Sequence, residues 1–181
     1  MSKEKIFTRR CFVKKSLYLA AGIVLASPLE SIATLTKHPM SFYHTHTDER
    51  LKIDYSGKGY ASSTLNKLDY LLRDFRTGEV HPIDPALLDI LYVIQQKSGS
   101  NGAIEIISGY RSPKTNKLLR SKNGGVARQS LHMKGRALDI RLTDLKTREL
   151  CDVAISLQRG GVGFYPKSNF VHIDTGRFRT W

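Results

Sequence analysis

The 181-residue sequence has only two cysteines, Cys11 and Cys151. Cys11 lies in an N-terminal segment that we interpret below as a leader, so the remaining chain has one thiol and no internal disulfide. Cys151 is interpreted as a small packed residue of a helix. Without disulfides the fold depends on its apolar core, and the 40% hydrophobic content suffices for one globular domain.

Acidic residues are also scarce, with 16 Asp and Glu against 29 Lys and Arg and a net charge of +13. Residues 1–33 hold six basic and two acidic side chains, so residues 34–181 hold 23 and 14 and carry +9. Such an excess favours a polyanionic partner, which can be nucleic acid, anionic lipid or an acidic wall polymer. The net charge alone does not choose among these three.

No hydrophobic run is long enough to span a bilayer comfortably, because the apolar stretch at residues 16–26 is short. It follows residues 8–14 (TRRCFVK), which match the twin-arginine export pattern. Small residues before position 34 predict cleavage after Ala33, giving a twin-arginine signal peptide of residues 1–33. An uncut membrane anchor is the alternative. No lipobox cysteine follows the apolar run, which argues against a lipid anchor.

Nucleotide-binding glycine motifs, zinc-finger spacings and internal repeats are absent. Hydrophobic periodicity and end signals instead predict a mixture of short strands and helices. Strands are expected at residues 50–55, 103–108, 137–142, 160–165 and 170–174. Helices are expected at residues 62–77, at 85–98, from Pro113, and from a cap at Thr143 or Asp144.

Two of these strands carry the candidate chemistry. In residues 137–142 (ALDIRL) alternate positions are apolar, so one face packs on the core and Asp139 lies on the other, near His132 in the preceding turn. Residues 170–174 (FVHID) repeat the pattern and place His172 away from the core. Two imidazoles and one carboxylate are the usual ligands of a catalytic zinc. A pair of ordinary hydrogen-bonded side chains is the alternative, and the spacing alone favours the metal site only modestly.

Several motifs together resemble a known family. Residues 109–112 (GYRS), the pattern SxHxxGxAxD at residues 130–139, and the later His172 resemble the zinc D-Ala-D-Ala metallopeptidases and their lysostaphin-like relatives. Within them, the leader, residues 160–163 (GGVG) and residues 168–181 are similar to the murein endopeptidase K group. The likeness extends over essentially the whole chain.

The resemblance implies an α+β fold, a small antiparallel sheet flanked by helices as in the hedgehog-like peptidases, for a catalytic domain of residues 34–181. Three residues are implied to bind zinc: His132, Asp139 and His172. Arg111 and Ser130 are implied to hold a carboxylate or carbonyl of a peptide stem. The implied activity is hydrolysis of peptidoglycan cross-links, which lets the wall expand. We expect a periplasmic monomer without stable membrane insertion.

One position departs from the family. Many relatives carry a carboxylate general base three residues before the last histidine ligand, where this chain has Asn169, an amide that cannot take a proton. Asp174 is the nearest substitute. It either takes the proton as the catalytic base or orients a metal ligand by hydrogen bonding to it. Glu105 and Asp144 are weaker candidates. Tyr165 is predicted to line the substrate groove or donate to the developing oxyanion, with packing as its alternative.

Two other functions compete with hydrolysis. Asn169 favours a peptidoglycan-binding protein of the same fold that has lost its activity. The positive charge alone favours nucleic-acid binding, which is weak because the basic residues are scattered and an exported protein meets little nucleic acid. A pair of histidines, His44 and His46, is expected to be exposed decoration of a strand rather than a metal site.

Overall fold

The structure is a computed structural model that describes residues 38–55, 59–122 and 125–181. The predicted leader and its cleavage site lie outside these residues. The described elements are β1 (His38–His44), β2 (Arg50–Tyr55), α1 (Ser62–Leu71), α2 (Pro85–Ser98), β3 (Ile104–Ser108), α3 (Pro113–Lys122), the 3-10 helix η2 (Leu131–Lys134), β4 (Ala137–Leu142), α4 (Thr147–Ser156), β5 (Gly161–Tyr165), the 3-10 helix η3 (Pro166–Ser168), β6 (Phe170–Asp174) and β7 (Arg179–Thr180). None of the described helices has the length and apolar character needed to cross a membrane.

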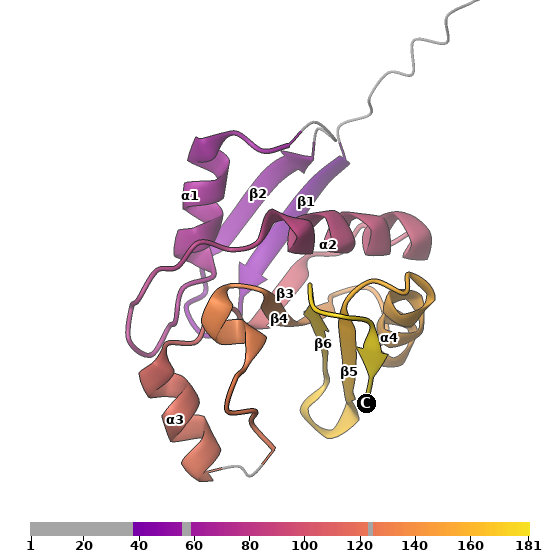
Figure 1. The fold of residues 1–181 in the computed structure, drawn as a ribbon. Helices are drawn as coiled ribbons and strands as arrows, with labels where there is room; N and C mark the ends of the chain where they lie inside the picture. Colours follow the sequence, from indigo (N-terminus) through magenta and orange to yellow (C-terminus); the bar gives the residue numbers. More distant parts are fainter. Residues whose placement is uncertain (1–37, 56–58, 123–124) are drawn as a thin grey trace, which may run out of the picture. The chain divides into compact units, whose positions relative to one another are not determined.

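The strands form one sheet of seven, in the order β2-β1-β3-β4-β6-β5-β7 (Figure 1). The pairs β1–β2, β3–β4, β4–β6 and β5–β6 are antiparallel, whereas β1–β3 and β5–β7 are parallel. The predicted α+β class is confirmed, with a sheet that is mixed rather than wholly antiparallel. The strand β1 was not predicted, because its segment reads as polar and mixed.

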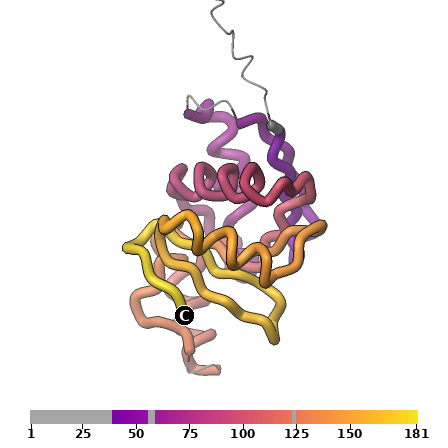
Figure 2. The backbone as a smooth tube through the Cα atoms, turned by 90° about the vertical axis from the view of Figure 1, so that its right-hand side faces the viewer, coloured from indigo at the N-terminus to yellow at the C-terminus, as the bar shows by residue number. Residues whose placement is uncertain are grey.

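Helix α2 forms where the sequence places signals at both of its ends. The Asp84 carboxylate accepts a hydrogen bond from the N–H of Ala86 at 3.0 Å, Pro85 begins the helix, and Gly99 ends it with a left-handed φ of 68°. Both predicted ends are confirmed. The apolar stripe of α2 is buried, and α2 contacts α4, which lies beside it in Figure 2. Cys151 of α4 is buried, as predicted.

Two predicted helix boundaries were wrong. Helix α1 ends at Leu71 instead of running to Gly78, because the chain turns around Asp74, whose carboxylate accepts the Arg76 N–H at 3.0 Å. Helix α4 begins at Thr147 rather than at a cap on residue 143 or 144. Those two side chains instead accept hydrogen bonds from the turn at residues 100–103, which precedes β3.

The neighbouring strands β4 and β6 position the candidate site. Their register places Asp139 opposite His172. The intervening residues Leu138, Val171 and Ile173 are buried in the apolar core. Because side chains alternate across a strand, the core-facing residues fix the opposite face for the aspartate and the histidine.

Candidate metal centre and its cleft

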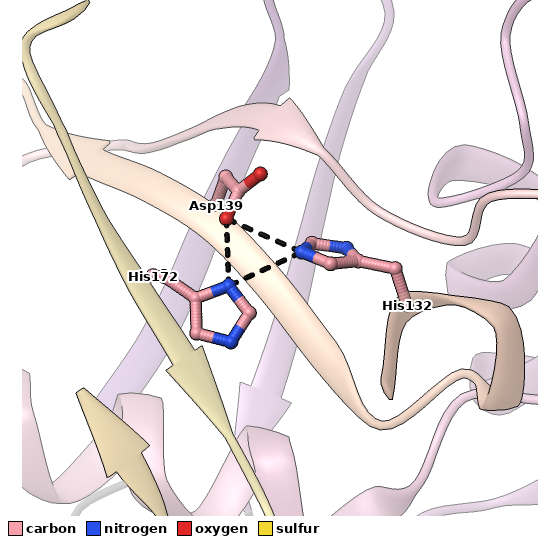
Figure 3. A group of neighbouring side chains, drawn as sticks. All are labelled: His132, Asp139 and His172. Atoms are coloured by element: carbon pink, nitrogen blue, oxygen red, sulfur yellow. Dashed lines mark hydrogen bonds and ion pairs between the residues drawn. The ribbon is translucent and has the colours of Figure 1, made fainter. Parts of the chain in front are cut away.

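Three side chains from η2, β4 and β6 converge on one point (Figure 3). One ligand atom from each of His132, Asp139 and His172 lies within 4.8 Å of the other two. The Oδ1 atom of Asp139 is 3.2 Å from Nε2 of His132 and 2.9 Å from Nδ1 of His172. The structure therefore brings together the three residues predicted as metal ligands.

Local chain geometry delivers His132 to this point. The Ser130 hydroxyl caps η2 by accepting the His132 N–H at 3.3 Å, and Gly135 ends it with a left-handed φ of 63°. A Cβ atom on Gly135 would lie 2.1 Å from the carbonyl oxygen of Pro82, so only glycine fits this turn. The short 3-10 helix is thus closed at both ends, which fixes where the histidine emerges.

Each imidazole is oriented through its other ring nitrogen. Nδ1 of His132 lies 2.7 Å from the carbonyl oxygen of Gly109 and donates to it, so the Nε2 lone pair faces the centre. Nε2 of His172 donates to Asp174 Oδ2 at 3.1 Å, so Nδ1 faces the centre. Burial lowers the pKa of His132. Burial also acts to lower the pKa of His172, but hydrogen bonds to Asp139 and Asp174 raise it overall.

Arg111 supports the aspartate of the centre. Its Nε donates to the Ser108 hydroxyl at 2.8 Å, and one terminal amino group is ion-paired with Asp139 Oδ2. Burial acts to raise the pKa of Asp139, yet the two histidines and this guanidinium hold it well below its usual range. The residue predicted to bind substrate therefore lies in the cleft, with one terminal nitrogen on a candidate ligand and its Nε on Ser108.

Asp174 is fully buried and saturated with donors. Its Oδ1 accepts the N–H groups of Gly161 and Gly176, both at 2.8 Å, and its Oδ2 accepts from His172 at 3.1 Å and from Arg179 at 2.6 Å. Burial acts to raise the pKa of Asp174, but these bonds hold it well below its usual range. Asp174 lies close to His172, as expected, and it orients the imidazole ring through the hydrogen bond with Nε2.

Asn169, where the resemblance led us to look for a base, is directed away from the centre. Its backbone is left-handed with a φ of 51°, and its side chain is hydrogen-bonded to the hydroxyl of Thr147 in a separate groove. Glu105 lines that same groove and is ion-paired with Arg141. Asp144 holds the turn before β3. None of these three side chains lines the cleft of the candidate centre.

The centre opens into a cleft of about 630 Å³. Ser130 and Tyr165, both predicted to contact substrate, line it. The ring of Tyr165 stacks on Phe170 with centroids 4.5 Å apart, and its hydroxyl accepts the indole N–H of Trp181 at 2.8 Å. Trp181 also packs closely on Gly163, where a Cβ atom would lie only 2.5 Å from the indole ring. One wall of the cleft is therefore aromatic.

Another part of the cleft holds residues that the sequence interpretation missed. His46 and Arg76 line it, with Phe75 between them. The Phe75 ring stacks on His46 with centroids 4.0 Å apart and has the Arg76 guanidinium 4.1 Å from its centroid. Burial and Arg76 lower the pKa of His46. His44 is fully buried, so the expectation that both histidines are exposed was wrong. The HxH spacing of His44 and His46 was the sequence feature that could have indicated a functional site here.

The donor set fits zinc. Two imidazole lone pairs and one carboxylate oxygen are the three protein ligands of a catalytic zinc, which keeps a fourth position for water or substrate. The hydrogen bonds from His132 to Gly109 and from His172 to Asp174 are the supports that such ligands normally have. A three-ligand centre at the base of an open cleft is the arrangement of a metal-dependent hydrolase.

Comparison with known proteins gives the family. Residues 32–181 match the model of the family described as peptidoglycan L,D-endopeptidase MepK, and the chain belongs to this family. The chain is similar to the probable peptidoglycan L,D-endopeptidase MepK of Haemophilus influenzae, with 44% identity over 90% of this chain and 89% of that protein. It is 39% identical, over the full length of both chains, to peptidoglycan L,D-endopeptidase MepK of Escherichia coli K12. The resemblance stated from the motifs is thereby confirmed, and the chain is a peptidase of peptidoglycan.

Proposed function

We propose that this chain is a zinc-dependent L,D-endopeptidase that hydrolyses peptide cross-links of peptidoglycan and so allows the wall to expand. The observation that carries the proposal is the convergence of three ligand atoms within 4.8 Å, from His132, Asp139 and His172, in a member of this family. Zinc held by these three residues would supply Lewis-acid chemistry, which polarises a scissile carbonyl and activates water near neutral pH.

The residues around the centre have distinct positioning roles. Asp174 fixes the ring of His172 through the Nε2 hydrogen bond, and Arg111 fixes the Asp139 carboxylate. Of the two roles predicted for Asp174, the geometry favours orientation, because each of its oxygens already accepts hydrogen bonds from other groups. The Arg111 terminal nitrogen that is free of Ser108 and Asp139 is available to a substrate carbonyl or carboxylate.

Tyr165 is suited to stabilise the developing oxyanion. Its oxygen accepts the Trp181 indole N–H, so its own proton remains available for donation into the cleft. Ser130 has the same property, because its hydroxyl oxygen accepts the His132 N–H and its proton is available to a peptide carbonyl. Both residues therefore keep the substrate-binding role predicted from the sequence.

His46 is suited to accept the proton that the attacking water loses. Its lowered pKa keeps the imidazole neutral at pH 7, and it lines the same cleft as the candidate centre. The other titratable groups of the cleft are the candidate ligands, the ion-paired Arg111, Asp174 and Arg179, the phenol of Tyr165, and Arg76, a cation that cannot accept a proton. This assignment leaves Asp174 as a positioning residue.

We further propose that residues 1–33 direct the protein through the twin-arginine route and are cleaved after Ala33, leaving a periplasmic monomer without membrane insertion. The residues TRRCFVK at positions 8–14 and a substrate class that lies outside the cytoplasmic membrane support this location. Replacing Arg9 and Arg10 by lysine should leave the uncut precursor in the cytoplasm. Normal processing of that variant would refute the route.

Digestion of purified sacculi, with mass analysis of the released peptides, tests the activity. We expect cleaved cross-links with the wild-type protein and none after a chelator. Elemental analysis should find no zinc in Asp139→Ala or His172→Ala, because a three-ligand centre has no spare ligand. The matched control His46→Ala removes a cleft histidine that is not a ligand and should keep its zinc. Stoichiometric zinc in either ligand variant would show that the ligand set is wrong.

The competing function is an inactive peptidoglycan-binding protein, and it was based on Asn169. That amide contacts Thr147 in another groove, so it bears on neither the candidate ligands nor the cleft. Bound zinc without any release of cleaved peptides from sacculi would nevertheless favour this function over hydrolysis.

A further inference from the structure

The positive charge of the domain is concentrated in one segment. Between Glu105 and Asp139 there are eight Lys and Arg residues and no acidic residue, a charge of +8 over residues 106–138. The rest of residues 34–181 holds 15 basic and 14 acidic side chains and carries only +1. The expectation that the basic residues are scattered was therefore wrong, since nearly the whole excess lies in about a fifth of the chain.

Much of this segment forms an arm, which we define as α3 together with residues 125–130. Figures 1 and 2 show α3 extending below the sheet in two perpendicular views. The arm is held at its base by Asp74, which is buried and accepts the Ser112 N–H at 2.8 Å. The Asn116 side chain ties helix to loop by donating to the Ala127 carbonyl oxygen at 3.2 Å. Six residues of the arm line the cleft: Leu119, Gly125, Val126, Ala127, Gln129 and Ser130.

The cations of the arm are exposed and lack counter-ions. Within the arm as the structure describes it, five side chains share both properties: Lys114, Lys117, Arg120, Lys122 and Arg128. Lys114, Lys117 and Arg120 recur every three residues on α3, so they form a row that spans about 9 Å along the helix.

The spacing of this row and its start in the first turn do not serve the stability of the helix, and only Arg120 has a favourable place, in the last turn. Like charges three or four residues apart destabilise a helix by a few tenths of a kcal/mol per pair. A lysine in the first turn also opposes the helix dipole, and α3 has no acidic residue in that turn to compensate. Helix stability therefore does not explain the row of cations, whereas binding of a polyanionic ligand does.

We propose that the α3 arm is a docking surface for the anionic peptidoglycan polymer beyond the cross-link that occupies the cleft. Its row of cations would contact carboxylates of neighbouring stem peptides. This inference rests on the proposed function. It identifies the polymeric wall, rather than an isolated peptide, as the substrate that the enzyme recognises.

Continuity with the cleft is what favours the wall over other polyanions. Residues of the arm line the cleft itself, so a polymer with one stem at the centre can place a neighbouring stem beside α3. Peptidoglycan repeats its carboxylates along every strand, which matches a row of cations better than a single anionic site. A surface for anionic lipid would have no reason to adjoin the centre.

The test compares polymeric and soluble substrates. In the triple variant Lys114→Gln, Lys117→Gln and Arg120→Gln, the change removes three charges and keeps similar helix propensity and a polar side chain at each position. Sedimentation with purified sacculi should show about tenfold weaker binding, since exposed charge pairs each contribute a small factor. The initial rate on sacculi should fall similarly, while the rate on soluble cross-linked dimers should stay within about twofold of wild type. Raising the salt concentration should weaken wild-type binding more than binding of the variant.

A matched control removes the same charge elsewhere. Lys52, Lys67 and Lys97 are exposed on β2, α1 and α2, line no part of the cleft, and are replaced together by glutamine. This control should bind and digest sacculi like wild type, and circular dichroism should show both triple variants folded. Equal losses in the two triple variants, or a loss on soluble dimers as large as on sacculi, would overturn the proposal.

Two further outcomes separate this inference from its alternatives. A wild-type protein that cleaves neither sacculi nor soluble dimers would refute the proposed function itself. A protein that cleaves both, with a triple variant that binds sacculi normally but loses binding to vesicles containing anionic lipid, would assign the arm to a membrane surface and overturn the docking proposal alone.

Discussion

Replacement of Asp174 by asparagine tests the geometry of the centre most sharply. The carboxylate meets five donor contacts, from Gly161, Gly176, His172 and two nitrogens of Arg179. Asparagine offers one acceptor oxygen instead of two and turns an amide N–H₂ toward some of the same donors. The His172 ring then loses its fixed orientation, or the two glycine N–H groups lose their acceptor.

The expected magnitudes follow from these contacts. Loss of a hydrogen-bonded carboxylate behind a histidine ligand costs about 10–100-fold in metal affinity, and excess zinc should partly restore the rate. The free energy of unfolding should fall by about 2 kcal/mol, because a buried charged acceptor is removed while Arg179 is 37% exposed and recovers hydration. If Asp174 were instead the general base, zinc affinity would stay normal and the rate would fall by about 10²–10⁴-fold.

Zinc affinity is measured by competition with a chromophoric chelator, and turnover is measured on soluble cross-linked dimers across a range of zinc concentrations. Arg179→Gln is the matched control, since it disturbs the same network but leaves the carboxylate on His172. It should lose stability while keeping zinc affinity. Normal zinc affinity in Asp174→Asn with a collapsed rate would refute the positioning role, and normal values of both would remove Asp174 from the mechanism.

Three further predictions concern the surroundings of the centre. Arg111→Lys keeps the charge but loses the planar guanidinium that reaches both Ser108 and Asp139. The kcat/KM on soluble dimers should therefore fall, and zinc affinity should weaken severalfold. An unchanged rate would show that Arg111 has only a structural role. His46→Ala should retain stoichiometric zinc and lose about 10²–10⁴-fold in kcat, together with the low-pH limb of the rate profile; a full rate would exclude it as proton acceptor. Burial acts to raise the pKa of Asp74, but hydrogen bonds from Thr115, Ser112 and the Arg76 N–H lower it overall. Its folded pKa therefore lies below its unfolded value of about 3.9, so its stabilising contribution is complete above that pH and is lost as the pH falls through the folded pKa. Asp74→Asn should lower the free energy of unfolding at pH 7 by about 1.5–3 kcal/mol, and chemical denaturation at pH 7 and pH 3 should find a smaller difference at pH 3.

The elements whose signals are local could be predicted from the amino-acid sequence. The alternation in residues 137–142 and 170–174 requires one apolar face, so Asp139 and His172 had to lie on the other. The ends of α2 follow from Asp84, Pro85 and Gly99 because capping involves only neighbouring backbone groups. The specific pattern around His132 was enough to indicate the family and the ligand set.

Features that depend on contacts between distant parts of the chain could not be predicted from the sequence. The register of β4 against β6 places Asp139 beside His172, and nothing local fixes that register. His46 enters the cleft because β1 pairs with β3, some 60 residues later in the chain, and Asn169 leaves the cleft because its turn is left-handed. The saturation of Asp174 likewise needs Gly161 from another strand. Periodicity specifies which face of an element is buried, whereas pairing between distant strands decides which polar side chains meet on the other face.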